Sequence, residues 1–143
     1  MSIRQISVFC ENQSGRLADV IGVISELGVD IRALSVADTD DFGVLRLIVN
    51  EPEKTADELR KRGIMVAVTE VIAVGFRDEP GALYRVLDLL RGCHIPVEYA
   101  YAFISRRQDD AYVILRVEDN QAAIAALRAQ NISLLDEFDL YAL

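Results

Sequence analysis

The sequence predicts an α+β protein built from two copies of one small domain. Residues 11–17 and 77–83 each place a glycine, Gly15 and Gly81, between a run of apolar and β-branched residues and an amphipathic pattern of helical spacing. The offset between the glycines (81 − 15 = 66) also relates other apolar positions of the two halves. A repeat of this length is too long for a solenoid unit and long enough for a small domain.

The first copy is expected to have a β-α-β-β-α-β order. Apolar runs predict four strands, and apolar stripes at helical spacing predict two helices that end at Gly28 and Gly63. The hydroxyl of Ser14 is suited to cap the first helix. The expected elements are a strand at 3–10, a helix from the Ser14 cap to Leu27, strands at 31–37 and 44–49, a helix at 53–62 and a strand at 64–69.

The second copy repeats this order. Residues 62–64 align with 130–132 at an offset of 68, so two residues were inserted in the second copy, in the hairpin near Gln108. The expected elements are strands at 71–76, 97–104, 111–117 and 133–140, and helices at 80–91 and 120–130.

The element order predicts, for each copy, a four-stranded antiparallel sheet with two helices on one face, the ferredoxin-like arrangement. We expect the two domains at 1–69 and 70–143. The strands at 64–69 and 71–76 follow each other without a linker, so we expect the domains to stay close together.

The composition limits the classes of partner. The formal net charge is −8, from 15 basic and 23 acidic residues, which argues against a nucleic-acid ligand because such ligands need a basic surface. The N-terminus lacks the apolar region of a signal peptide, and no apolar run reaches the length of a membrane span, so we expect a cytoplasmic protein that binds no membrane.

Metal, cofactor and disulfide chemistry find little support in the sequence. Two cysteines, Cys10 and Cys93, make no disulfide framework, and we expect both to be small buried residues. No cysteine–histidine cluster has metal-ligand spacing, so neither a metal nor a cofactor is expected. The single histidine, His94, follows a predicted helix, where a surface or C-terminal capping role is the usual one.

The glycine turns are the candidate ligand site. A helix start offers unpaired N–H groups and a positive local field, and glycine lets the backbone approach a ligand closely. A polar residue three positions earlier, Asn12 or Asp78, is able to hold a ligand amine. One such turn is able to bind the charged head of an amino acid. The alternative is that the glycines serve the turn sterically, while Ser14 and Pro80 only cap helices.

These residues resemble a known family. A strand followed by [Asp/Asn]-x-[Pro/Ser]-Gly-x-Leu and a helix ending in Gly-[Val/Ile]-[Asp/Asn]-Ile is similar to the ACT domain. Residues 12–17 with 28–31 match this pattern, and residues 78–83 match its first half. Residues 93–97 depart from it, because His94 replaces the usual Gly and Pro96 the usual Asp or Asn. Residues 33–46 resemble the small stand-alone tandem ACT proteins of bacteria.

The resemblance implies a regulatory protein that binds a free amino acid between paired ACT domains. The site would lie near the glycine turn and the start of the second strand. By position, it would comprise Asn12, Ser14, Gly15, Arg16, Leu17, Asp30 and Ile31 in the first copy, and Asp78, Pro80, Gly81, Ala82 and Leu83 in the second. Arg16 is able to pair with a ligand carboxylate, although it equally suits a solvated first turn.

The expected function is an amino-acid sensor without enzymatic activity. Ligand binding would favour one arrangement of the domains, and the output would be association with a metabolic enzyme. We expect a homodimer, because exposed sheet edges invite pairing. One alternative is an interaction subunit that resembles the small regulatory subunit of acetolactate synthase. Another is a small enzyme, for which the sequence supplies no convergent acid and base.

Overall fold

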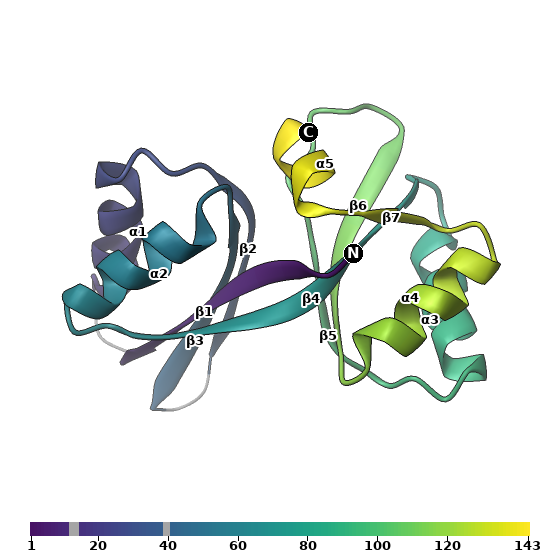
Figure 1. The fold of residues 1–143 in the computed structure, drawn as a ribbon, viewed down its shortest axis with the longest axis horizontal. Coiled ribbons are helices and arrows are strands. Elements are labelled where there is room, and N and C mark those ends of the chain that lie inside the picture. The colour runs from purple at the N-terminus through teal and green to yellow at the C-terminus, as the bar shows by residue number, and fades with distance from the viewer. Residues whose placement is uncertain (12–14, 39–40) are drawn as a thin grey trace. The chain divides into compact units, whose positions relative to one another are not determined.

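The computed structural model describes residues 1–11, 15–38 and 41–143 and divides the chain into two compact units. One unit comprises Arg4–Thr69, and the other comprises Glu70–Leu143 together with Met1–Ile3. Each unit contains an antiparallel sheet and helices in the ferredoxin-like order (Figure 1). The predicted fold class is therefore confirmed.

The first unit has one apolar core between its sheet and its helices. Its elements are β1 (Ile3–Glu11), α1 (Arg16–Glu26), β2 (Ile31–Asp38), β3 (Phe42–Val49), α2 (Pro52–Lys61) and the start of β4 (Met65–Arg77). The strand order is β2-β3-β1-β4, and β3 pairs antiparallel with both β1 and β2. The core joins Val8 and Leu47 of the strands to Ile24 of α1 and Leu59 of α2, so both helices cover the same face.

The second unit repeats this arrangement. It adds to β4 the elements α3 (Ala82–Gly92), β5 (Val97–Ala102), β6 (Asp110–Val117), α4 (Asn120–Ala129), β7 (Ser133–Leu135) and α5 (Glu137–Ala142). Strand β4 pairs antiparallel with β6 and β7, and β5 pairs with β6. The core joins Val74 and Leu115 of the sheet to Leu90 of α3 and Leu127 of α4.

The end of the chain differs from the expected strand at 133–140. Strand β7 ends at Leu135, and α5 begins after Asp136. The Asp136 carboxylate accepts a hydrogen bond from the Asp139 backbone N–H, and the Asp139 carboxylate accepts one from the Asp136 N–H. This reciprocal cap, the capping box, starts a helix that buries Leu140. The apolar residues here fit a strand pattern, but the capping box of Asp136 and Asp139 stabilises a helix instead.

The predicted strands at 64–69 and 71–76 are one continuous strand, β4, because no turn residue interrupts this stretch. The predicted helix at 80–91 begins at Ala82, since Gly81 before it has left-handed backbone. The expected cap at Ser14 lies outside the described residues.

The duplication is visible in the backbone. Three equivalent positions of the two repeats have positive φ, the left-handed conformation that favours glycine, and Asp109 of the second repeat is a further one at 73°. The equivalent pairs are Gly15 and Gly81 (φ 81° and 87°), Gly28 and His94 (67° and 56°), and Gly63 and Asn131 (76° and 57°). The exposed His94 therefore keeps the helix-ending geometry of the glycine that it replaces.

The two inserted residues lie between the paired strands of the second repeat. Ile31 pairs with Val49 and Val97 pairs with Val117, and each ladder has an irregularity immediately after its first pair. The paired residues are 18 positions apart in the first repeat (49 − 31) and 20 in the second (117 − 97). The hairpin between β5 and β6 is therefore longer by two residues.

Candidate functional site

The first glycine turn is shaped by its backbone angle. Gly15 precedes α1 with φ 81°, and its carbonyl accepts a hydrogen bond from the Asp19 N–H at 3.0 Å. A Cβ built on Gly15 would meet no heavy atom within 4 Å. Glycine is therefore favoured at this position by the left-handed backbone conformation and not by crowding from a neighbouring atom. The predicted site residues Asn12 and Ser14 lie outside the described residues.

A cavity of about 190 Å³ lies beside this turn. Glu11 at the end of β1 and Arg16 at the start of α1 both border it, while Phe9, Phe42 and Met65 give it an apolar wall. Leu17, another predicted site residue, is exposed and does not line this cavity. The sequence pattern found Arg16, but it missed Glu11 and the apolar wall, because those residues lie on three different strands.

The predicted residues Asp30 and Ile31 lie at the far end of α1 from Gly15. Helix α1 has 11 residues, which corresponds to about 16 Å along its axis. Within one unit, the glycine turn and the start of β2 are therefore at opposite ends of the helix that connects them. One small ligand is unable to touch both groups of residues in the same repeat.

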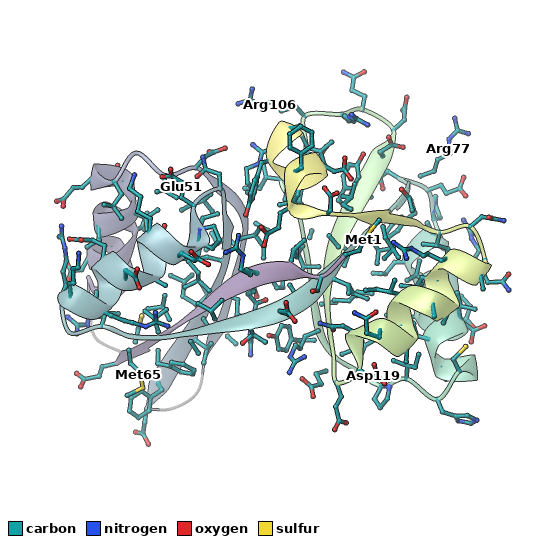
Figure 2. The ribbon with its side chains drawn as sticks, in the orientation of Figure 1. Met1, Glu51, Met65, Arg77, Arg106 and Asp119 are labelled. Carbon is teal, nitrogen blue, oxygen red and sulfur yellow. The ribbon has the colours of Figure 1, made fainter. Side chains whose placement is uncertain are left out.

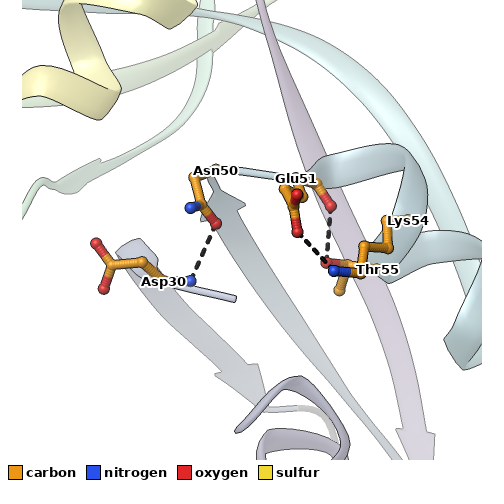
Figure 3. A network of polar contacts seen from close by, with 5 residues as sticks. All are labelled: Asp30, Asn50, Glu51, Lys54 and Thr55. Atoms are coloured by element: carbon orange, nitrogen blue, oxygen red, sulfur yellow. Dashed lines mark hydrogen bonds and ion pairs between the residues drawn. The ribbon is translucent and has the colours of Figure 1, made fainter. Parts of the chain in front are cut away.

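The start of β2 is held by a local polar network (Figure 3). The Asp30 N–H donates to the Asn50 side-chain oxygen at 3.0 Å, and the Asn50 N–H donates to the Asp30 carbonyl at 3.3 Å. The Asp30 carboxylate accepts a hydrogen bond from the buried Arg32 guanidinium at 3.1 Å. Beside Asn50, the Thr55 hydroxyl and the Lys54 ammonium both donate to Glu51. The two bonds with Asn50 hold the backbone of Asp30.

The second glycine turn carries an arginine that the sequence pattern missed. Gly81 precedes α3 with φ 87°, and its carbonyl accepts a hydrogen bond from the Arg85 N–H at 3.0 Å. The Arg85 guanidinium pairs with Glu79 at 2.6 Å, and a Cβ on Gly81 would lie 3.5 Å from its Nη1. Arg85 therefore folds back over the turn. Arg85 lies one helical turn after Gly81, and this spacing is the sequence signal that could have indicated it. Asp19 occupies the equivalent position in the first repeat.

A cavity of about 550 Å³ lies between the second turn and the β5–β6 hairpin. The predicted residues Asp78, Gly81 and Leu83 all border it, together with Arg107 from the hairpin. Phe103 and Tyr112 also line it, and their rings meet edge to face at a centroid distance of 6.2 Å.

The remaining predicted residues of the second repeat lie elsewhere. Ala82 is buried and lines a separate cavity of about 480 Å³ on the helix side of the sheet, and the exposed Pro80 borders neither cavity. The structure therefore brings three of the five predicted residues of the second repeat to one cavity.

The two cysteines differ in environment, and the expectation that both are buried is wrong for Cys93. Cys93 is exposed just after α3, since its side chain lies at the open end of the helix. Cys10 is half-buried beside the first turn. Burial raises the pKa of the Cys10 thiol above its usual value, and the nearby Arg16 guanidinium offsets part of that rise.

We expect iodoacetamide to alkylate Cys93 faster than Cys10 in the native protein at pH 8, because Cys10 is less accessible. Burial also raises the pKa of the Cys10 thiol, which lowers the share of its reactive thiolate. Peptide mass spectrometry over time measures both rates in one sample. Equal rates in the native protein, rather than only after denaturation, would contradict the environment described for Cys10.

Part of the sequence is similar to small subunits of acetolactate synthase. The acetolactate synthase isozyme 3 small subunit of Escherichia coli (strain K12) is 39% identical over 61 residues, which are 41% of this chain and 37% of that protein. The acetolactate synthase small subunit of Buchnera aphidicola subsp. Schizaphis graminum (strain Sg) is 35% identical over 75 residues, 50% of this chain and 48% of that protein. The chain thus spans about half or less of the curated relatives that it matches.

Solved structures share the fold over most or all of the chain. Protein BT0572 from Bacteroides thetaiotaomicron superposes with a TM-score of 0.93 at 35% identity, covering 100% of this chain and 98% of that chain. The ligand-free regulatory subunit of aspartate kinase from Thermus thermophilus gives a TM-score of 0.63 at 16% identity, with 88% and 90% covered, which is a likeness of fold alone.

No helix in the described ranges is both long and apolar enough to span a membrane. The family model described as an ACT domain pair matches residues 1–143. This match covers both repeats, both glycine turns and the strand β4 that the repeats share. The chain therefore belongs to the ACT domain pair family.

Proposed function

We propose that this protein is a regulatory amino-acid sensor without enzymatic activity, built from ACT domains at residues 1–69 and 70–143. The observation that carries the proposal is the duplicated turn. In each repeat, a left-handed glycine opens a helix, and a cavity lies beside it. Backbone N–H groups at a helix start favour a carboxylate, which every free amino acid has.

The geometry of one repeat supports a ligand held between paired ACT domains. Because Gly15 and Asp30 lie at opposite ends of α1, a ligand that contacts both kinds of residue needs a turn from one domain and a β2 start from another. Such a ligand favours the arrangement of domains that binds it more tightly, and this differential affinity is the regulatory signal.

We propose that the protein acts in the cytoplasm as a homodimer. Strand β2 ends the strand order of the first repeat, and its Leu34 and Val36 are 45% and 54% exposed. An edge strand with exposed apolar side chains favours pairing with a second strand. The expected output of ligand binding is a change in association with a metabolic enzyme.

A second candidate is a regulatory interaction subunit of an amino-acid biosynthetic enzyme. The similarity to acetolactate synthase small subunits favours it. In that case, the glycine turns serve the fold or bind ligand only beside a catalytic chain. Co-purification of the native protein with a large enzyme would support this candidate.

A thermal-shift screen against the twenty common amino acids tests the proposed sensor. A ligand at about 100 times its Kd is expected to stabilise the folded protein by about 2.7 kcal/mol, which gives a readily measured increase in Tm. Calorimetry on each hit then provides the affinity and the number of sites per chain. The absence of any hit at millimolar concentrations would contradict the sensor and favour the interaction subunit.

A further inference from the structure

We infer that the first repeat selects an amino acid with an apolar side chain, held in the 190 Å³ cavity with its carboxylate at Arg16 and its ammonium group at Glu11. This inference rests on the proposed function and specifies its ligand. It also assigns the binding to the first repeat rather than to both.

The charges at the cavity match the two charged groups of an amino acid. Glu11 and Arg16 border the same cavity from opposite sides of the glycine turn, and both are exposed. Neither forms an ion pair within the described part of the chain, with the other or with a third residue. Arg16 is the first residue of α1, where the positive end of the helix adds to its attraction for a carboxylate.

The remaining wall of the cavity is apolar and partly open to solvent. Phe9, Phe42 and Met65 are 38%, 53% and 70% exposed, and the side chain of Met65 projects from the start of β4 in Figure 2. Large apolar side chains gathered at one exposed place usually mark a binding surface. The cavity is smaller than the roughly 300–1,000 Å³ of sites for drug-sized ligands, so it suits a single amino acid.

The second repeat shows that the fold itself does not require this cavity lining. Glu11 pairs with Phe42 across β1 and β3, and Arg77 pairs with Asp110 at the equivalent place in β4 and β6. The residues of the second repeat that replace Phe9, Glu11, Arg16, Phe42 and Met65 are Gly75, Arg77, Ala82, Asp110 and Ser133. The acidic group becomes basic, the Arg16 cation is absent, and none of the three large apolar side chains is kept, although the strand pairing is equivalent.

Ile64 and Val20 also line the cavity, and their equivalents Ile132 and Val86 line the cavity of about 480 Å³ in the second repeat. The inner, structural side of the cavity is therefore common to both repeats. Arg77 and Ala82, the equivalents of Glu11 and Arg16, also line that cavity, but Gly75, Asp110 and Ser133, the equivalents of the apolar wall, do not. This contrast favours a ligand role for the apolar wall of the first repeat.

Isothermal titration calorimetry on the full chain tests the selectivity. Leucine, methionine and phenylalanine are the apolar probes, and serine, aspartate and lysine are the polar probes. We expect at least one apolar probe to bind one site per chain about tenfold or more tightly than every polar probe. Leucinamide and N-acetylleucine, which lack the carboxylate and the ammonium charge respectively, are expected to bind about tenfold or more weakly than leucine.

Three variants locate the site. Phe42→Asp and Met65→Ser introduce the residues of the second repeat, and Arg16→Gln removes the cation. Each is expected to weaken binding of the best apolar probe by about tenfold or more. The control is Ile104→Ser, which makes polar an apolar residue outside this cavity and the β2 edge. Ile104 is 60% exposed, a fraction between those of Phe42 and Met65, and its replacement is expected to leave the affinity unchanged.

The native cysteines provide an independent measure of location. The bound probe is expected to slow alkylation of Cys10, which lines the cavity, and to leave that of Cys93 unchanged. The inference is overturned, while the sensor function stands, if a polar amino acid binds most tightly. The same holds if an apolar amino acid binds but the three variants do not weaken it and it does not slow alkylation of Cys10. If no amino acid binds, both fail, and the apolar wall instead marks a protein contact.

Discussion

Truncation of Leu47 to alanine is expected to lower the free energy of unfolding by about 2–5 kcal/mol, because it removes buried methyl groups and leaves a cavity. Leu47 is fully buried between the sheet and helices of the first repeat. Leu115 has the equivalent place in the second repeat and is also fully buried, so Leu115→Ala is expected to cost a similar amount. Urea denaturation of the purified variants measures both losses.

The control for these truncations is Leu34→Ala. Leu34 lies opposite Leu47 in the β2–β3 ladder but is 45% exposed, because β2 is at the edge of the sheet. Since Leu34 is already 45% exposed before the change, the expected loss is under about 1 kcal/mol. A loss at Leu34 as large as that at Leu47 would contradict the described core.

Replacement of Gly15 by alanine is expected to destabilise the protein by about 1–2 kcal/mol, because a residue with a Cβ is strained in the left-handed conformation. At Gly15, the strain of the backbone angle is separate from any steric clash of the added Cβ. The added Cβ would have no neighbour within 4 Å, so the backbone angle of 81° is the sole source of the expected loss. Chemical denaturation of Gly15→Ala measures it, and calorimetry on the same variant shows whether the turn also contributes to ligand affinity.

Gly22 is the matched control for Gly15. It lies inside α1, its Cβ would also have no neighbour within 4 Å, and its φ is not in the left-handed region. Alanine is the better helix former by roughly 1 kcal/mol, so Gly22→Ala is expected to stabilise the protein. Changes of the same sign at Gly15 and Gly22 would mean that the two backbones do not differ as described.

The fold was predictable from the sequence because its signals are local and occur twice. Glycine turns, helical stripes and apolar runs appear at a nearly constant offset, and each depends on a few neighbouring residues. The error at the end of the chain has the same origin. Residues 133–140 have the apolar content of a strand, but Asp136 and Asp139 cap each other's backbone and start α5. A capping box that consists of two aspartates departs from the usual sequence signature.

The candidate site was predictable only in part. The glycine pattern indicated Gly15, Gly81 and Arg16, because these residues follow one another in a short motif. It did not indicate Arg85, whose relation to the turn depends on its side chain folding back toward Glu79. The resemblance to the ACT domain, and not the glycine pattern, grouped Gly15 with Asp30 in a site between paired domains. Within one repeat these two residues lie at opposite ends of α1.

The sequence by itself determined the duplication, the order of the elements as far as β7 and the position of each glycine turn, since these depend on local propensity and periodicity. Only the tertiary structure decided which residues line each cavity. Phe9, Phe42 and Met65 come from three strands that are far apart in the chain, and pairing of those strands brings them beside Glu11 and Arg16. A cavity is formed by residues that are close in space, and that closeness follows from strand register and helix packing.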